Sequence, residues 1–270
     1  MSRKFLLCTA ASAALLTSPA FAADLPVKAP PAPPALAWSW AGFYIGGHGG
    51  YGWKQNHYSQ VFSVNPLVTF GGIDSRGWVA GGQAGYNWQY GRWVTGLEVD
   101  GSATQIRGTS TPVVRNFAGG LTITDTRGDD VKYLGTVRAR VGGAVPFANT
   151  DVLLYGTAGL AWERLNRTDS TFNALPGGTQ LVSTVTPRDH FGWVAGVGGE
   201  VRLGATNWIG RVEYLHYDFG TVEPAQTIIT AGGPSFTEKG GRQTIDVVRG
   251  GLSYKFDATA APLSDRKSVV

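Results

Sequence analysis

The residues with the most reactive side chains lie together at His57, Tyr58 and Ser59, in the stretch HYS. A histidine beside a serine has the residue types of a general base and a nucleophile. A working pair also needs an acidic side chain to orient the histidine, and none lies nearby in the sequence. His190 and His216 are isolated, and no phosphate-binding loop, zinc-type histidine pair or nucleophile elbow occurs. We therefore predict no catalytic site, no metal and no cofactor.

The elements that carry the remaining polar residues are strands. From Gly42 onward apolar and polar residues alternate with a period of two, and no stretch of useful length follows the helical period of 3.6. A low charged fraction of 16% and 39 glycines also favour an all-β protein. Eight alternating segments stand out, at residues 42–53, 78–89, 92–101, 131–145, 151–163, 190–203, 207–217 and 244–256.

Short and long connections alternate between these segments. Links near 90–91, 146–150 and 204–206 fit tight turns. The others, 54–77, 102–130, 164–189 and 218–243, run to roughly two dozen residues or more, far beyond a usual connection. An antiparallel up-and-down barrel explains this pattern, with four long extracellular loops at one end and three short periplasmic turns at the other. Two loop stretches, VFSVNPLVTF at 61–70 and AQTIITAGG at 225–233, alternate enough to extend the strands.

The alternation also places charged residues on one face of each strand. Arg138 and Arg140, for example, share one face of their segment, while Val137 and Ala139 share the other. An arginine facing lipid at the bilayer midplane would cost about 2 to 4 kcal/mol, so these charges should face the lumen, where acids and bases can pair. The predicted lumen network consists of Glu98, Arg138, Arg140, Glu200, Arg202, Arg211, Glu213 and Arg249, with Asp100 and Lys255 on the same face.

The tryptophans favour a membrane barrel over a soluble barrel of lipocalin type, which would carry its charges outside and an apolar cavity inside. The alternation of charged and apolar residues along the strands is compatible with both kinds of barrel. Seven tryptophans fall at segment ends, as expected for two aromatic girdles at the membrane interfaces. The predicted girdle residues are Trp53, Trp78, Trp162 and Trp193 towards the long connections, and Trp88, Trp93 and Trp208 towards the short turns.

The N-terminal residues carry export signals. Residues 1–22 combine a basic start, an apolar run and a small-residue cleavage pattern, which predicts a secretory signal peptide that includes Cys8, the only cysteine. Residues 23–41 are rich in proline, and we expect a flexible periplasmic lead-in. The barrel itself should cover residues 42–256.

The C-terminal residues end the barrel and then depart from it. Tyr254 and Phe256 have the outward spacing of a final strand that is recognised for barrel assembly. Residues 257–270 are expected to form a disordered tail. We interpret its last six residues, DRKSVV at 265–270, as a translated sequencing adapter, because their codons can match the start of a widely used adapter; an ordinary disordered terminus is the alternative.

Several motifs, taken in order, resemble one known family. They are AADLP, GFYIGG, GGQAGYNWQ, GLEVD, LGTVRARVG, GTAGLAW, VEYLHYDFG and GLSYKF. This pattern resembles the small eight-stranded outer-membrane proteins and surface antigens of alpha-proteobacteria, often described as porin-family or opacity-type proteins. The resemblance implies an immunogenic envelope barrel exposed at the cell surface of a Gram-negative bacterium, and it does not imply a catalytic site. Family members usually end at the final aromatic residue, so the tail departs from the pattern.

The expected function is a structural or surface-interaction role in the outer membrane. A narrow porin-like channel for small solutes is the alternative, and a lipid-modifying outer-membrane hydrolase is less favoured. Eight strands enclose a bore that side chains fill, which argues against an open channel. Expected partners are outer-membrane lipid, lipopolysaccharide, the barrel assembly machinery and an unidentified extracellular ligand. Nucleic acid is not expected, because the net charge of +4 is matched by basic residues at the two termini, Arg3, Lys4, Arg266 and Lys267.

Overall fold

The computed structural model describes residues 38–56, 59–62, 73–116, 120, 122–147, 150–175, 177–222, 226–228, 236–239 and 241–256. The predicted signal peptide, most of the predicted lead-in, the tail 257–270 and the pair His57 and Tyr58 lie outside these residues. Within the described part of the chain, no helix is long and apolar enough to cross a membrane.

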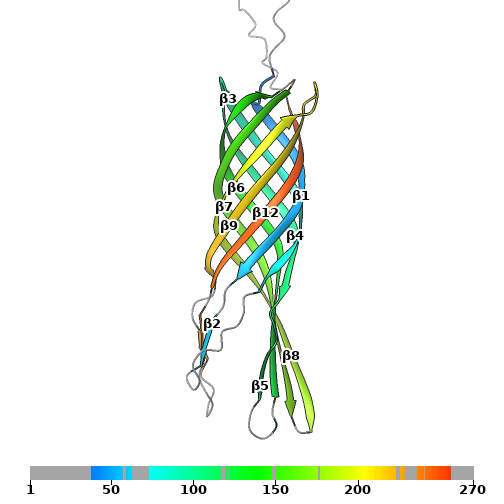
Figure 1. The fold of residues 1–270 in the computed structure, drawn as a ribbon, viewed down its shortest axis with the longest axis vertical. Coiled ribbons are helices and arrows are strands. Elements are labelled where there is room, and N and C mark those ends of the chain that lie inside the picture. Colours follow the sequence, from blue (N-terminus) through cyan, green and yellow to red (C-terminus); the bar gives the residue numbers. More distant parts are fainter. Residues whose placement is uncertain are drawn as a thin grey trace, which may run out of the picture. The chain divides into compact units, whose positions relative to one another are not determined.

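Eight long strands form a closed antiparallel ring. They are β1 (Gly42–Asn56), β3 (Ser75–Tyr90), β4 (Trp93–Thr109), β6 (Thr122–Phe147), β7 (Thr150–Leu175), β8 (Gly178–Arg202), β9 (Trp208–Val222) and β12 (Gly241–Lys255). Each ring strand pairs with the next in chain order, and the pairing of β1 with β12 closes the ring (Figure 1). The prediction of eight antiparallel up-and-down strands is therefore confirmed. Closure leaves the ring itself without an edge, so its backbone groups pair within the sheet.

The connections follow the predicted alternation except in one place. At the short-turn end, Gly91 and Gly204 take a left-handed φ of 62°, which glycine adopts without strain. At the long-connection end, the third connection is only residues 176–177, because β7 and β8 continue as strands through the region predicted as a loop. The β-branched residues of the stretch TQLVSTVT in β8 are compatible with an extended backbone, and the pairing of β7 with β6 and β8 supplies the partners that make it a strand.

Three strands accordingly run beyond the others. β6, β7 and β8 have 26, 26 and 25 residues, against 15 to 17 in the other five ring strands. Their extra length, residues 122–130, 166–175 and 178–188, forms a sheet that we call the distal sheet, with β5 (Val113–Asn116) paired to β6 (Figure 1).

Three further strands form a separate small sheet. They are β2 (Ser59–Phe62), β10 (Gln226–Ile228) and β11 (Phe236–Lys239), paired in the order β10, β11, β2. The described parts of the two alternating loop stretches therefore pair with β11 instead of continuing the ring strands. Residues 63–70 and 229–233 of those stretches lie outside the described residues.

The interior of the ring is filled in layers. Close to the short-turn end Trp40, Val94, Leu153 and Ile209 are buried. The middle holds charged residues. On the side towards the long connections comes an apolar layer from seven strands, which consists of Val79, Ile106, Val131, Leu134, Ala161, Leu165, Val194, Leu215, Tyr217, Phe219, Ile245 and Val247. Because each of these side chains occupies an inward position of its strand, the bore is packed at several levels.

Trp40 belongs to the segment predicted as a flexible lead-in, yet it is only 1% exposed. Its backbone N–H donates to Gln89 Oε1 at 2.7 Å, and the Lys255 ammonium donates to the carbonyl of Ala41 at 3.4 Å. Residues 39–41 are thus tied to β3 and β12. Burial of the large apolar area of the Trp40 indole stabilises the contact of this segment with the barrel.

Candidate functional site inside the barrel

The middle of the bore contains four arginines and four acids on inward positions of five strands. β4 supplies Glu98 and Asp100, β6 supplies Arg138 and Arg140, β8 supplies Glu200, β9 supplies Arg211 and Glu213, and β12 supplies Arg249. All eight residues are at most 4% exposed. Their formal charges cancel, which is the condition under which buried ions are tolerable.

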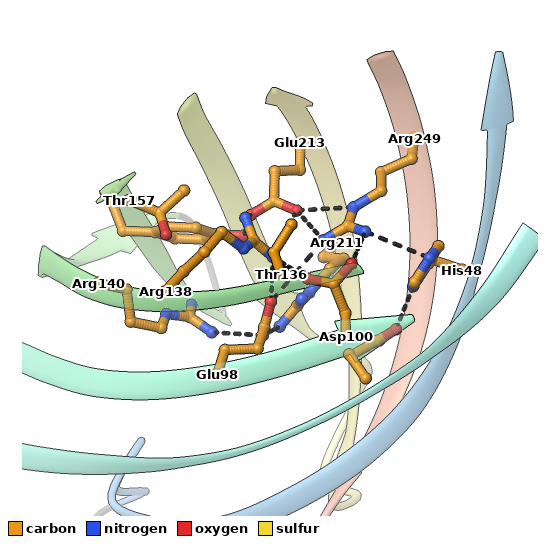
Figure 2. A network of polar contacts seen from close by, with 12 residues as sticks. His48, Glu98, Asp100, Thr136, Arg138, Arg140, Thr157, Arg211, Glu213 and Arg249 are labelled. Carbon is orange, nitrogen blue, oxygen red and sulfur yellow. Dashed lines mark hydrogen bonds and ion pairs between the residues drawn. The ribbon is translucent and has the colours of Figure 1, made fainter. Parts of the chain in front are cut away.

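The eight residues form one connected ion-pair network, and Figure 2 labels all of them except Glu200. Glu213 is shared, with Oε1 at 2.9 Å from Arg138 Nη1 and Oε2 at 2.7 Å from Arg249 Nη2. Glu98 also contacts several guanidinium groups. Its Oε2 is 2.7 Å from Arg211 Nη2, and its other oxygen contacts Arg138. Such charge-assisted hydrogen bonds are the strong ones in a protein interior.

The remaining acids connect the two sides of the bore. Asp100 is 2.9 Å from Arg249 Nη1 and 3.1 Å from Arg138 Nη2. Glu200 Oε1 lies 2.7 Å from Arg211 and 2.8 Å from Arg140. Every arginine therefore meets at least two acids, and the layer links strands that are not neighbours in the ring. These links hold the barrel wall together across its interior.

Tyrosines complete the layer. Tyr44 Oη donates to Glu98 Oε2 at 2.7 Å and accepts from Arg140 Nη1 at 2.9 Å. Tyr155 Oη donates to Glu213 Oε1 at 3.1 Å, and the Arg140 guanidinium carbon lies 3.9 Å from the Tyr155 ring centroid. That distance is within the range of a cation–π contact.

His48 joins the network through one defined tautomer. Arg249 Nη1 lies 3.2 Å from His48 Nε2, and an arginine can only donate, so Nε2 must accept. The ring hydrogen then sits on Nδ1 and is donated to Gln83 Oε1 at 2.5 Å. Nε2 also lies 2.8 Å from Ser102 Oγ, whose hydroxyl can donate to it, so His48 links β12, β3 and β4.

Seven of the eight residues predicted for the lumen network lie in this layer. Arg202 is elsewhere: it lies at the end of β8, where its Nε donates to the carbonyl of Thr206 at 3.0 Å in the turn. The sequence reasoning missed Tyr44, His48 and Tyr155. Their inward positions follow from the parity of their strands, but the predicted network contained charged residues only.

The seven predicted girdle tryptophans all lie on the outer face, each at least 36% exposed. Towards the long connections, Trp78 packs edge-on against Tyr51 with ring centroids 5.5 Å apart. Towards the short turns, Trp208 packs against Tyr254 at 5.2 Å. Exposed rings thus occur near both ends of the ring strands, as in an interfacial girdle.

The two residues predicted to mark assembly lie where the final strand meets β1. Tyr254 and Phe256 have ring centroids 5.2 Å apart, and Phe256 also lies 5.7 Å from Phe43. The backbone N–H of Phe256 donates to the carbonyl of Phe43 at 2.8 Å. The last aromatic residue therefore sits at the closing seam of the barrel, 46% exposed on its outer face.

His190 and His216 each contact an acidic side chain. His216 Nδ1 lies 2.7 Å from Asp246 Oδ1, and Tyr214 Oη donates to the same oxygen at 2.6 Å. His190 Nδ1 lies 3.0 Å from Glu163 Oε1. Among the described residues, no group of three or more His, Cys, Asp or Glu side chains is arranged to hold a metal ion.

A second buried ion cluster lies beyond the level of Trp53 and Trp162, towards the long connections. Asp129 accepts from Lys54 Nζ at 2.9 Å and from Arg167 Nε at 3.0 Å. The cluster joins β1, β6 and β7. Burial raises the pKa of Asp129, but the two cations outweigh burial and hold the pKa below its ordinary value.

We expect acid to remove the stabilisation that Asp129 provides. Because its pKa is lower in the folded state, this stabilisation is complete above the ordinary aspartate pKa of about 3.9 and is lost as the pH falls through the lower folded value. The melting temperature of the wild type in detergent should therefore exceed that of Asp129→Asn at neutral pH. The difference should shrink as the pH falls below about 4. A difference that stays constant down to the most acidic condition would contradict this assignment.

Comparisons with known proteins agree with this architecture. The sequence model of the outer membrane protein beta-barrel domain family matches residues 8–256. The 31 kDa outer-membrane immunogenic protein of Brucella melitensis is 33% identical over 255 residues, which cover 92% of this chain and 98% of that protein. The 22 kDa outer membrane protein of Rhizobium leguminosarum bv. viciae is 30% identical over 190 residues, covering 70% of this chain and 68% of that protein.

The solved structures share less sequence identity with this chain than the two relatives above. The outer membrane protein OprG from Pseudomonas aeruginosa has a TM-score of 0.39 at 14% identity, covering 81% of this chain and 97% of that one. Neisserial surface protein A has a TM-score of 0.35 at 13% identity, covering 80% and 98%. Because the family model spans nearly the whole sequence and the 31 kDa relative aligns over almost its full length, this chain belongs to the outer membrane protein beta-barrel domain family and lies in the outer membrane.

Proposed function

We propose that this protein is a closed outer-membrane anchor that presents the distal sheet at the cell surface for interactions. The filled bore is the observation that carries the proposal. A neutral ion-pair layer from Glu98 to Arg249 and the apolar layer beyond it occupy successive levels of the barrel. A permeating ion would have to displace side chains in both layers.

The distal sheet supports the second half of the proposal. Its strands continue some 11 to 15 residues beyond the level of Tyr133, Trp162 and Trp193, which at about 3.3 Å per residue is roughly 35 to 50 Å. Outer-membrane barrels carry their long connections outside the cell and their short turns in the periplasm. The relatives named as immunogenic are consistent with a surface position for this sheet.

We expect little or no steady conductance from the pure protein in planar lipid bilayers. The four arginines and four acids pair with one another and leave no unbalanced charge to line a pore. Single-channel recording at several voltages, with a sixteen-stranded porin as the positive control, checks this. Large, stable and reproducible channels would replace the anchor proposal with the channel alternative.

Surface presentation is tested by cysteine labelling on intact cells. Ser183→Cys, in the distal sheet, should react with a membrane-impermeant maleimide. Ala205→Cys, in the turn between β8 and β9, should react only after the outer membrane is broken. Both positions are exposed, so accessibility of the side chain itself is matched. The reverse labelling pattern would invert the orientation and remove the surface role.

The remaining expected partners follow from the same placement. Outer-membrane lipid and lipopolysaccharide would contact the outer face with its exposed aliphatic and aromatic side chains. The barrel assembly machinery would recognise the final strand, where Leu252, Tyr254 and Phe256 point outward. The catalytic alternative has no favouring observation: His57 lies outside the described residues, and His190 and His216 contact the carboxylates of Glu163 and Asp246.

A further inference from the structure

The distal part of β8 presents an open sheet edge. Residues 178–192 pair with β7 on one side, from Leu175↔Gly178 to Ala161↔Gly192. Pairing with β9 on the other side begins only at Trp193. Within the described residues, no strand pairs with this second side of residues 178–192. An edge of this kind offers unpaired backbone donors and acceptors to an additional strand.

The composition of this edge differs from that of protected edges. Proteins usually blunt an exposed edge with charged side chains, especially lysine, or with proline. Here the ten residues GTQLVSTVTP at 178–187 contain no charge, and the first charged residue is Arg188. Leu181, Val182 and Val185 are 67%, 48% and 57% exposed. Pro187 is the residue that marks the limit of the stretch, since proline cannot donate to a ladder and occurs in sheets at edges.

We infer that this edge pairs with the same edge of a second copy of the chain, antiparallel and centred on Ser183. In that register Leu181 faces Val185 of the partner copy, so apolar residues oppose each other on one face. On the other face Val182 faces Thr184, and Gln180 faces Thr186. The absence of charge matters most here, because two identical charged strands would place like charges opposite each other, and that is destabilising.

The antiparallel direction fixes how the two copies meet. In each copy β8 runs from the tip of the distal sheet at Gly178 towards the barrel at Trp193. Two such strands are antiparallel only when the sheets approach tip to tip, so the copies belong to two facing membranes. Trp193 lies ten positions after Ser183, which is about 33 Å of strand in each copy. This inference rests on the proposed surface position of the distal sheet, and it names a second copy of the chain as the partner of that sheet.

Cysteine cross-linking tests the pairing directly. Cys8 is the only cysteine and lies in the predicted signal peptide, so the full mature chain offers a cysteine-free background. Two vesicle populations, each carrying Ser183→Cys protein with a different fluorescent label, should form mixed disulfide dimers on mild oxidation. The matched control is Ser170→Cys on β7, whose Oγ lies 3.1 Å from that of Ser183 but which pairs with strands on both sides. It should cross-link several-fold less.

A charge exchange tests the partner and the register. Ser183→Lys and Ser183→Glu each place two like charges opposite each other when a population meets itself, so neither vesicle population should cluster alone. A mixture of the two should cluster again, as measured by light scattering, because the opposed charges then attract. Clustering of wild-type vesicles with rescue in the mixture supports the inference.

The inference would be overturned by the absence of mixed dimers with Ser183→Cys, by equal cross-linking at Ser170→Cys, or by clustering that is unchanged by the charge substitutions. Dimers confined to one membrane would also overturn it, because they exclude the tip-to-tip arrangement. The proposed function is judged separately. Labelling of Ser183→Cys on intact cells would still show a surface-exposed sheet even if no pairing between copies occurred.

Discussion

Glu213→Ala should lower the free energy of unfolding by about 3 to 5 kcal/mol, the usual cost of removing one partner from a buried ion pair. The Glu213 carboxylate accepts hydrogen bonds from Arg138, Arg249 and Tyr155. Without it the guanidinium groups of Arg138 and Arg249 stay buried, and the layer carries an excess positive charge. Unfolding in urea from detergent or lipid, followed by tryptophan fluorescence and by the gel mobility of unboiled samples, measures the loss.

The exposed pair of Arg164 and Asp189 provides the matched control. Its Nε–Oδ1 distance of 2.7 Å is as short as those in the bore, but both side chains are 54% exposed. Asp189→Ala should therefore cost far less than Glu213→Ala, because water screens an exposed ion pair. A double-mutant cycle of Arg138→Ala and Glu213→Ala should show strong coupling, because these two side chains touch. Equal costs for Glu213→Ala and Asp189→Ala would show that the bore network does not stabilise the barrel.

Gly159→Ala should destabilise the barrel by about 1 to 3 kcal/mol through overpacking. Gly159 on β7 lies opposite Arg138 on β6. A Cβ at Gly159 would be 2.0 Å from the carbonyl oxygen of Val137 and 2.7 Å from the Cα of Arg138, so the backbone of β6 would have to move. That movement would also displace Arg138 from the ion-pair layer.

Gly143→Ala is the control for this substitution. Gly143 is a ring-strand glycine on β6, but no heavy atom lies within 4 Å of a Cβ built there. Alanine should be neutral or slightly stabilising at that position, because glycine loses more chain entropy on folding. Both variants are compared by the same urea titration. Similar stabilities for the two alanine variants would mean that close approach of β6 and β7 is not required.

The sequence by itself determined the architecture of the ring. A period of two over eight segments requires strands, and the alternation of short and long connections requires antiparallel neighbours in chain order. Parity then separated Arg138 and Arg140 from Val137 and Ala139, because successive side chains of a strand point to opposite faces. For this reason seven of the eight residues expected in the lumen could be named before their surroundings were known. Arg202 has the same parity but lies too close to the turn to reach the layer.

The extent of the strands was less accessible from sequence. The segment 164–189 is long enough for a loop, and its polar threonines and serines fit either a loop or an exposed strand. Its strand structure depends on the pairing of β7 with β6 and β8, which supplies partners for the backbone along the whole distal sheet. The local composition of 164–189 does not reveal those partners, because they come from other parts of the chain.

Only the tertiary structure decided which charges meet. Arg138 and Glu213 are 75 residues apart and lie on strands β6 and β9, which are not neighbours in the ring. Their contact depends on the register of every strand pair between them and on the curvature that brings opposite walls together. The same closure brings His48 to Arg249 and places an apolar layer beside the charges. The position of a residue in the alternation determines which face of the sheet its side chain occupies. The geometry of the closed ring determines which side chain it meets across the bore.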